Sequence, residues 1–335
     1  METPIIKIIC LISLIVFSTF LHPSLSELCN PEDKKALLQI KQALNNPSIL
    51  ASWDPQTDCC DWLYVQCNDN HRINSIIIEN GKLEGPIPPQ VGNLPYLKVL
   101  EFITNPKLTG PIPPTIAKLK RLQLFRISKA NITGPIPEFI AEMKSLKSVE
   151  ISSARLTGQI LSSLSGLSNL TELNLNRNLL TGPIPSSFGE FKGEYFFLDL
   201  SRNKLLGKIP ASLGKRTFDV IDLSWNRLEG DASLLFGPKR STWKVDLSMN
   251  SFEFDISNVE FAKTLEFLDI NHNKIFGRLP EGLTQLSLVH FNVSYNRLTG
   301  EIPQGGDLQR FDASGYRGND LCGPPLSRCD VVTAL

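Results

Sequence analysis

The sequence is poor in histidine, has no net charge and lacks cysteine throughout its long central part, and each of these absences excludes a class of function. Only 4 of the 335 residues are histidine, and none stands with a serine or cysteine in a recognised catalytic motif. Lys plus Arg and Asp plus Glu are equal at 34 each, so the basic footprint that nucleic acid requires is missing. We therefore expect neither an enzyme nor a nucleic-acid-binding protein, and no catalytic residue, cofactor or metal.

Long apolar runs are also missing after residue 26. Residues 1–26 carry Lys7, an apolar run from Ile8 to Phe20 and then Ser24-Leu25-Ser26, which is typical of a secretory signal peptide that is removed. A single-pass anchor is the alternative, but the run is short for spanning a membrane. We expect the mature protein to be secreted, extracellular and free of a membrane span.

Cysteine is confined to the two ends of the mature chain. Four cysteines lie near its start, Cys29, Cys59, Cys60 and Cys67, and two near its end, Cys322 and Cys329. An even number in a secreted chain indicates disulfides, and the spacing does not fit a zinc site. Because Cys59 and Cys60 can hardly bond to each other, the simplest pairing is Cys29–Cys59 with Cys60–Cys67, and Cys322–Cys329 at the end.

What the sequence has in abundance is a repeat. A glycine returns every 23 to 25 residues, often within Gly-x-Ile/Leu-Pro, and upstream lies an L-x-x-L-x-L frame such as Leu170, Leu173 and Leu175. A fixed period of this length with this frame is typical of leucine-rich repeats, which stack into a solenoid. The repeat glycines are Gly85, Gly110, Gly134, Gly158, Gly182, Gly207, Gly230, Gly277 and Gly300, with Phe254 at the one vacant position.

These patterns predict an α/β solenoid: a right-handed superhelix of about ten repeats of about 24 residues, with a concave parallel sheet and disulfide-stapled caps. We divide the chain into a signal peptide (1–26), an N-terminal helical cap with two disulfides (27–70), the repeats (71–303) and a C-terminal cap (304–335). The prolines exclude long helices on the convex side. A recurring asparagine after the strand is expected to bond turn backbone; its members are Asn178, Asn203, Asn226, Asn250, Asn273 and Asn296.

The concave strands carry the candidate binding surface. By strand alternation, the residue between the two framing leucines faces solvent, and four consecutive repeats place an aspartate there. Trp225 and Trp243 are also expected at solvent-facing strand positions, where Trp is typical of binding hot spots. The predicted partner-binding residues are Lys147, Glu150, Ser152, Asn174, Asn176, Asp199, Asp222, Ser224, Trp225, Trp243, Lys244, Asp246, Asp269, His272 and His290.

Each of these choices has a plainer alternative. The aspartates can be solvated members of a Leu-Asp-Leu-Ser consensus, and Trp243 can fold onto Lys244 or Phe267. His272 and His290, expected on adjacent strands, would make binding sensitive to pH. Among the sequons, Asn131 and Asn169 are expected outside the strand centres and to carry glycans, whereas Asn292 faces the concave side and is expected to stay bare.

The chain resembles the plant polygalacturonase-inhibiting proteins over its whole mature length. The resemblance is carried by Leu28-Cys29-Asn30-Pro31, Thr57-Asp58-Cys59-Cys60-Asp61-Trp62, Leu228-Glu229-Gly230-Asp231-Ala232-Ser233 and Phe291-Asn292-Val293-Ser294-Tyr295-Asn296. It implies a cell-wall protein that binds fungal endopolygalacturonases through its concave face. Similar proteins have one more cysteine pair, at the places of Thr299 and Asp320, and the segment 318–323 resembles receptor-like proteins of the same repeat type.

The resemblance and the repeat together predict a secreted, monomeric inhibitor of fungal endopolygalacturonase in the plant cell wall or apoplast, with cell-wall pectin as a second candidate partner. The main alternative is a soluble receptor-like or coreceptor module with no enzyme target. A further alternative is an ice-binding stress protein, because regular Asn, Ser and Thr rows order water, although Trp, Phe and Asp interrupt those rows here.

Overall fold

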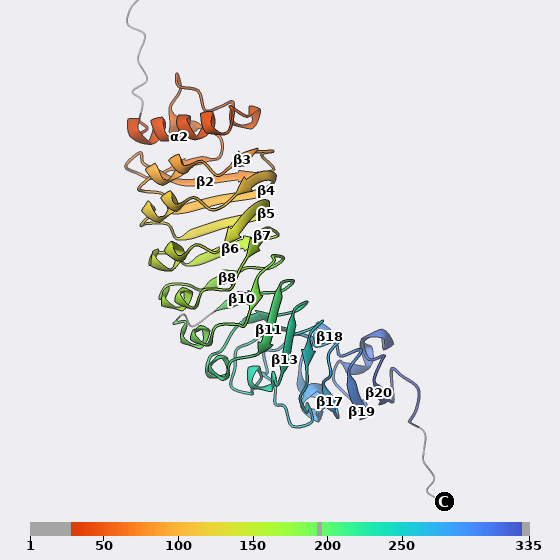
Figure 1. Cartoon of the computed structure of the whole chain (residues 1–335). Helices are drawn as coiled ribbons and strands as arrows, with labels where there is room; N and C mark the ends of the chain where they lie inside the picture. The colour runs from red at the N-terminus through yellow and green to blue at the C-terminus, as the bar shows by residue number, and fades with distance from the viewer. Residues whose placement is uncertain (1–27, 193–195, 330–335) are drawn as a thin grey trace, which may run out of the picture.

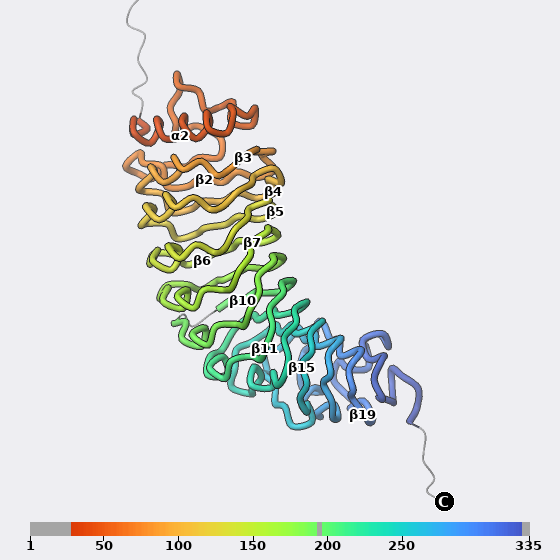
Figure 2. The backbone as a smooth tube through the Cα atoms, in the orientation of Figure 1, coloured from red at the N-terminus to blue at the C-terminus, as the bar shows by residue number. Residues whose placement is uncertain are grey.

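The computed structural model describes residues 28–192 and 196–329 as one curved solenoid. Its turns stack from α2 at the N-terminal end to β20 at the C-terminal end (Figure 1). The backbone tube shows each turn lying against the next along the whole length (Figure 2). The predicted signal peptide and the last residues of the predicted C-terminal cap lie outside the described residues. No helix in the described part is long and apolar enough to cross a membrane.

The N-terminal cap is built on α2 (Pro31–Ala43), which covers the first turn of the solenoid. The Asn30 side chain accepts hydrogen bonds from the backbone N–H groups of Glu32 and Asp33, and Pro31 begins the helix, so the predicted N-terminal cap forms. The predicted apolar face is buried: Ala36, Leu37, Ile40 and Leu44 are at most 2% exposed. Burying this face against the first repeat keeps the edge of the core out of water.

Disulfides close both ends of the described chain. Cys29–Cys59 and Cys60–Cys67 lie in the N-terminal cap, and Cys322–Cys329 lies in the C-terminal one. These are the pairs that the spacing favours.

The concave side is a single sheet, parallel except for its first, antiparallel pair β1–β2, and its strands follow chain order. Its strands are β1 (Val65–Cys67), β2 (Ile73–Glu79), β4 (Val99–Gly110), β5 (Leu124–Pro135), β6 (Ser148–Ser152), β8 (Glu172–Asn174), β10 (Phe197–Asp199), β12 (Val220–Asp222), β14 (Lys244–Asp246), β16 (Phe267–Asp269) and β18 (His290–Asn292). β3 (Gly85–Pro86) pairs with β4, and β7 (Arg155–Thr157) pairs with β5. The parallel pairing and chain-ordered strands agree with the predicted fold.

Within each of the later repeats, a second short strand follows the turn after the concave strand, and these second strands form two smaller sheets. One has β9 (Thr181–Gly182), β11 (Lys204–Lys208), β13 (Arg227–Gly230) and β15 (Ser251–Phe252); the other has β17 (Phe276–Gly277), β19 (Arg297–Glu301) and β20 (Asp320–Cys322). The repeat glycines have positive φ, for example +79° at Gly182 in β9; the earlier ones, such as Gly85 and Gly110, lie in β3 and β4 of the large sheet. A side chain is strained in that conformation, which explains the periodic glycine.

Short 3₁₀ helices occupy most turns of the convex side, as the proline tracts predict. They span Ser48–Leu50, Cys59–Asp61, Pro89–Asn93, Pro114–Lys118, Glu138–Glu142, Ser162–Gly166, Ser186–Glu190, Ala211–Lys215, Ser233–Leu235, Glu281–Gln285, Leu308–Arg310 and Ala313–Gly315, the first two and the last two belonging to the caps. Six of the convex ones follow directly on a proline in extended conformation that belongs to the Gly-x-Ile/Leu-Pro segment, as at Pro185 and Pro280.

The asparagine ladder holds successive turns together as predicted. Asn203 donates from Nδ2 to the carbonyl oxygens of Leu175, Leu200 and Ser201 at 2.9–3.2 Å, and its Oδ1 accepts from the N–H of Leu180 at 3.0 Å. The ladder also extends further than the sequence indicates. Asn105 and Asn319 make the same kinds of bonds at the first and last turns.

The C-terminal end places Thr299 directly opposite Asp320. The two residues are register partners on the neighbouring parallel strands β19 and β20. These are the positions at which the resemblance implies an additional cysteine pair. Neighbouring strands lie about 4.8 Å apart, which is within the Cα separation that a disulfide spans.

Candidate functional site

The middle positions of the concave strands form one row across the sheet, but most of its carboxylates are buried. Asp199, Asp222 and Asp269 are each 8% exposed, so the expectation that the row faces solvent freely is wrong. Neighbouring strands are close enough for the side chains to cover one another. The other members of the row are Ile77, Glu101, Arg126, Glu150, Asn174, Asp246 and Asn292, of which Glu101, Glu150 and Asn174 are also buried.

Hydroxyl groups two residues further along hold these carboxylates in place. Asp199 Oδ1 accepts from the N–H of Ser201 at 2.9 Å and from its hydroxyl at 2.7 Å. Ser224 bonds Asp222 in the same way, at 3.1 and 2.7 Å. Ser152 donates to Glu150 at 2.6 Å. Because Ser152 and Ser224 are at most 5% exposed, they position carboxylates rather than reach a partner, which corrects their predicted contact role.

The first half of the row contains a cation of its own. Arg126 lies between two glutamates, with its Nε 2.7 Å from Glu150 and a terminal nitrogen 3.6 Å from Glu101. Burial nevertheless raises the pKa of Glu101, although Arg126 opposes the shift. One cation between two buried acids leaves a smaller excess of negative charge here than in the second half.

The second half of the row keeps an excess of negative charge. We call Asp199, Asp222, Asp246 and Asp269 the aspartate row. Lys244 Nζ lies 3.2 Å from Asp222, and His290 Nε2 lies 3.0 Å from Asp269, but Asp246 has no ion-pair partner within the described residues.

Burial and the two flanking aspartates raise the pKa of Asp246 to about 6. Burial and the charge of Asp222 also raise the pKa of Asp199, while Asn176 opposes this shift by donating to the Asp199 carboxylate at 2.8 Å. Unrelieved like charges across one sheet favour the approach of a cationic group.

The two tryptophans are exposed, but they flank the strands instead of lying in them. Trp225 follows β12 by three residues with φ +54°, is 46% exposed, and has the Arg202 guanidinium 4.6 Å above its ring. Trp243 directly precedes β14 and is 44% exposed. It has no ring contact with Phe267 in the described chain; Lys244 instead places its ammonium 4.9 Å from the Phe267 ring. Both indoles are therefore available at opposite edges of the sheet.

The two histidines also lie at opposite edges. His290 begins β18, where it stacks on Phe267 with ring centres 4.1 Å apart. His272 lies beyond the end of β16 rather than on the strand, with its ring 4.2 Å from that of Tyr295. The two imidazoles therefore have separate partners, Tyr295 for His272, and Phe267 and Asp269 for His290. Among the other predicted contacts, Lys147 is exposed and Asn176 is half-buried, whereas Asn174 is buried.

Apart from Phe197, several residues of this surface are not among the contacts predicted from the sequence. Glu172, Phe197, Asp219 and Val220 line a pocket of about 590 Å³ together with Trp243, Thr171 and Phe196. Tyr295, 42% exposed, adds a further ring at the other edge. The pocket residues lie just before or at the start of a strand, a position at which the sequence indicates Lys147, Phe197, Trp243, Lys244 and His290 but not the others.

The sequons differ in their setting. Asn131 lies in the later part of the long strand β5, beyond the central concave position at Arg126; its side chain is exposed and donates to the carbonyl of Pro106 at 2.7 Å. Asn169 lies outside the strands, exposed, and donates to the carbonyl of Lys144 at 2.9 Å. Asn292 is half-buried in β18 and accepts from Ser294. Glycans at Asn131 and Asn169 stay a prediction.

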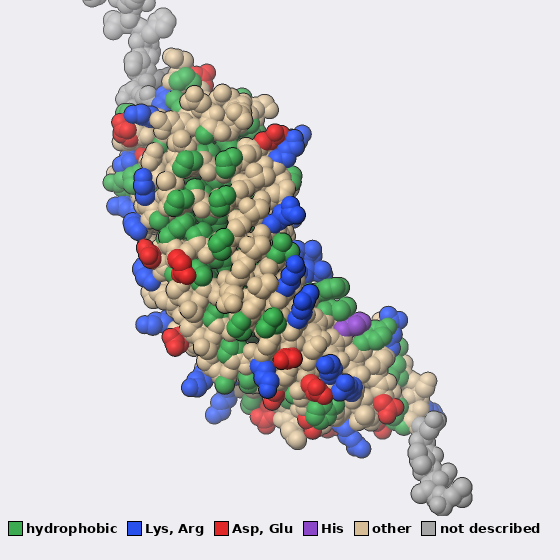
Figure 3. Space-filling model, viewed as in Figure 1, with side chains coloured by type: hydrophobic (Ala, Val, Ile, Leu, Met, Phe, Trp, Pro, Cys, Tyr) green, Lys and Arg blue, Asp and Glu red, His purple; other side chains and the backbone are tan. Residues whose placement is uncertain are grey.

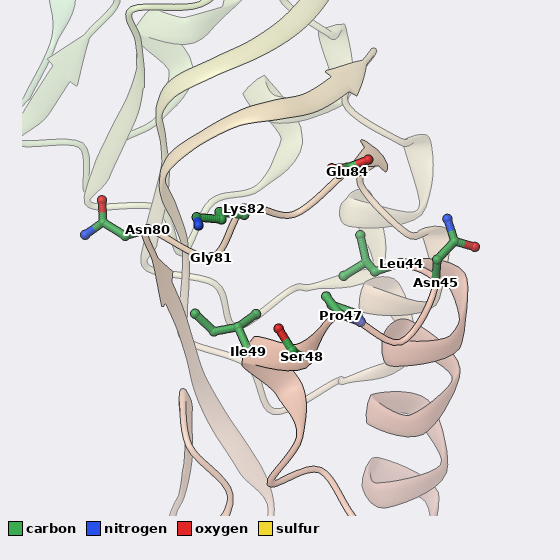
Figure 4. Close-up of a pocket in the computed structure, with 9 residues that line it drawn as sticks. All are labelled: Leu44, Asn45, Pro47, Ser48, Ile49, Asn80, Gly81, Lys82 and Glu84. Carbon is green, nitrogen blue, oxygen red and sulfur yellow. The ribbon is translucent and has the colours of Figure 1, made fainter.

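A second pocket, of about 540 Å³, lies where the N-terminal cap meets the first repeat (Figure 4). It is lined by Leu44, Asn45, Pro47, Ser48, Ile49, Asn80, Gly81, Lys82 and Glu84, whose polar groups come from two separate loops and do not converge. The described groupings close enough to hold a metal consist of the N-terminal cysteines, with Asp58, and those cysteines are in disulfides. We therefore take the concave sheet as the candidate site.

Comparison with known proteins defines the class first. The model of the leucine-rich repeat N-terminal domain matches residues 30–68, and the leucine-rich repeat model matches 169–191, 197–215, 264–286 and 287–306. The chain is thus a leucine-rich-repeat protein with the matching N-terminal cap.

Whole-chain similarity then gives the family. The chain is 59% identical over 321 residues to polygalacturonase inhibitor 1 of Arabidopsis thaliana, covering 94% of this chain and 97% of that one. It is 60% identical over 320 residues to the polygalacturonase inhibitor of Vitis vinifera, covering 94% and 96%. The chain belongs to the polygalacturonase inhibitor family. Among solved structures, it is similar to a plant ice-binding protein with a TM-score of 0.89 and 46% identity, covering 91% of this chain and 99% of that one.

Proposed function

We propose that this chain is a secreted plant defence protein that binds and inhibits microbial, chiefly fungal, endopolygalacturonases. The observation that carries the proposal is identity of about 60% to polygalacturonase inhibitors along almost the whole of both chains. The described concave sheet supports it, because an exposed indole, a row of buried carboxylates and flanking cations form an extended surface suited to a protein partner.

Inhibition of this kind requires no chemistry from the inhibitor. A protein that covers the substrate cleft of an enzyme excludes the polysaccharide by occupying its path. We propose the apoplast or cell wall as the place of action, a monomer as the active form, and pectin as a second candidate partner. The aspartate row supports a basic patch on the enzyme as the complementary surface.

The test is release of reducing ends from polygalacturonic acid by a panel of fungal endopolygalacturonases, with and without the purified protein. We expect inhibition of at least one enzyme at a stoichiometric ratio, with no activity of the protein alone. A folded, monodisperse sample that inhibits none of them would contradict the proposal. Capture of a membrane receptor kinase by such a sample would favour the receptor-like alternative.

Ice binding is a second candidate, because a plant ice-binding protein shares the fold at a TM-score of 0.89. The charges of this chain speak against it. Exposed Arg155, Lys204 and Arg227 stand on β7, β11 and β13, and acidic and basic side chains mix over the second half of the face shown in Figure 3. An ice-recrystallisation assay decides the point, and activity there without enzyme inhibition would replace the first candidate.

A further inference from the structure

The pocket beside Trp243 lies at the N-terminal ends of four neighbouring strands. The first residues of β8, β10 and β12, and the residues just before β8, β10, β12 and β14, form its lining: Thr171, Glu172, Phe196, Phe197, Asp219, Val220 and Trp243. The register of the sheet aligns Glu172, Phe197 and Val220 side by side. Aromatic and aliphatic surface thus forms the middle of the pocket, with a carboxylate on either side of Phe197.

Both carboxylates are held in fixed directions by neutral donors. The hydroxyl of Ser148 donates to Glu172 at 2.7 Å. Asp219 accepts from the N–H of Phe196 at 2.7 Å and from the hydroxyl of Ser241 at 3.1 Å. In the described chain no lysine or arginine lies within ion-pair distance of either one. The cations that act on them at longer range are Arg126 for Glu172 and Arg216 for Asp219.

The indole of Trp243 differs from the other exposed rings of the surface. Trp225 has Arg202 over its face, and Phe267 has Lys244 at 4.9 Å. Among the described residues no cation lies over Trp243, although its ring is 44% exposed and stands one strand away from Asp219. Lys244, its neighbour in sequence, points to Asp222 instead. The pocket therefore combines an aromatic face that favours a cation with two acids that have no close counterion.

We infer that this pocket receives a lysine or arginine side chain of the partner protein. The apolar stem of such a side chain fits Phe197 and Val220, its charged head meets Asp219 or Glu172, and the cation packs on Trp243. An apolar side chain would desolvate the two carboxylates without compensation, and an acidic one would be repelled. The inference rests on the proposed function, since it names the chemistry by which a target enzyme is anchored.

The first experiment measures the inhibition constant for an enzyme of the panel that the wild-type protein inhibits. Trp243→Ala removes the aromatic face, and the double variant Glu172→Gln/Asp219→Asn removes the charge while keeping the shape and the acceptors. We expect each to weaken inhibition at least tenfold, which corresponds to about 1.4 kcal/mol. Leu206→Ala is the matched control, because Leu206 is 49% exposed on β11, away from the concave sheet. Pocket variants that inhibit as well as this control would overturn the inference.

A double-mutant cycle then identifies the occupant. Each lysine or arginine on the contact face of the enzyme is replaced by methionine and tested against wild type and Trp243→Ala. We expect one basic residue whose loss is non-additive with Trp243→Ala by about tenfold, since residues in contact couple whereas distant ones add. Additive effects at every basic residue would refute the assignment.

A third measurement needs no enzyme and separates failure of this inference from failure of the proposed function. The protein is labelled with 5-fluorotryptophan, and the Trp243 signal is assigned from Trp243→Phe. We expect N-acetyl-arginine methylamide or N-acetyl-lysine methylamide to shift that signal in the wild type and not in Glu172→Gln/Asp219→Asn. If no enzyme is inhibited but the shift occurs, the proposed function is wrong and the assignment of the pocket as a site for a basic side chain is supported. If the wild type shows no shift, that assignment is wrong.

Discussion

The two halves of the concave row handle buried charge in different ways. In the first half Arg126 lies between Glu101 and Glu150, so a cation of the chain itself compensates the acids. In the second half four aspartates follow one another on successive strands, and the third, Asp246, has no ion-pair partner among the described residues. Most acids of both halves are buried, and the halves differ in how this buried charge is compensated.

The paired acids of the first half stabilise the solenoid, whereas the aspartates of the second half form a surface suited to a partner. A buried acid that is paired with a cation of the same chain contributes to the fold and has no charge left for a partner protein. A buried acid flanked by like charges lowers the stability of the fold until a cation of a partner binds next to it. The turns differ as well. The asparagine ladder is continuous in the second half. In the first half it includes Asn105, but Ala130 and Ala154 occupy the next two positions, after the positive-φ residues Lys129 and Ser153.

The largest effect is expected from breaking the ladder in the second half. Asn203→Ala deletes four hydrogen bonds to buried backbone and leaves their partners unsatisfied, so we expect the free energy of unfolding to fall by about 4 kcal/mol. Asn169→Ala, in protein without glycan, is the control, because it loses one exposed bond. Urea unfolding measures both. Equal losses would mean that the ladder does not stabilise this half.

Much of this architecture could be predicted from the sequence, because its causes are local and periodic. The repeat glycines, the leucine frame and the ladder each depend on a residue's own position in the repeat. Burial of Asp199 and Asp222 could not be predicted this way, since alternation gives only the side of the strand; how deeply a side chain is covered depends on strands about 24 residues away. Ser224 was misjudged for the same reason.

The pocket beside Trp243 could not be predicted from the sequence for a related reason. The rest of the lining comes from three repeats and includes Glu172, Phe197, Asp219 and Val220. The repeat pattern does not identify any one of these residues as part of a pocket. Only the sheet register places them together. The indole itself was found because a large aromatic residue is unusual at that position, but its exact place before β14 depends on where the strand begins.

The two ends of the described chain also differ, because the N-terminal cap has two disulfides and the C-terminal cap has one. Thr299→Cys with Asp320→Cys places two thiols on register partners. Closing a loop of about 20 residues should stabilise the fold by about 3 kcal/mol. Thermal unfolding with and without reductant measures the gain, and mass spectrometry verifies the bond. A bond that forms without raising the midpoint would show that this end does not limit stability.

Removing Arg126 tests whether the first half depends on its own cation. Arg126→Met leaves Glu101 and Glu150 buried with no counterion, and we expect a loss of about 2–3 kcal/mol near neutral pH, reduced by the partial exposure of the arginine. The loss should shrink in acid, because burial raises the pKa of Glu101 and this carboxyl takes up its proton early as the pH falls. Lys244→Met is the matched variant in the second half, where a smaller loss is expected because Lys244 faces one aspartate at 3.2 Å. Equal losses would erase the distinction between the halves.

The smallest effect, and the one that addresses the second half most directly, is expected from Asp246→Asn. Burial and the charges of Asp222 and Asp269 raise the pKa of Asp246 to about 6. A carboxyl whose pKa is higher in the folded than in the unfolded protein binds its proton more tightly when folded. Its contribution to stability is therefore greatest below about pH 4 and is lost as the pH rises through about 6.

Asparagine keeps the acceptor for Ser248 and removes the charge, so Asp246→Asn should stabilise the protein by about 2 kcal/mol at pH 7 and by almost nothing at pH 4. Asp255→Asn should have the opposite effect on stability, because hydrogen bonds from Ser257 lower the pKa of Asp255. The contribution of Asp255 to the stability of the fold is lost as the pH falls. Urea unfolding at the two pH values measures both. If Asp246→Asn stabilises the fold and at the same time weakens inhibition, the repulsion in the aspartate row is retained for a cationic partner; if it destabilises at pH 7, the row is compensated within the chain and the two halves are alike.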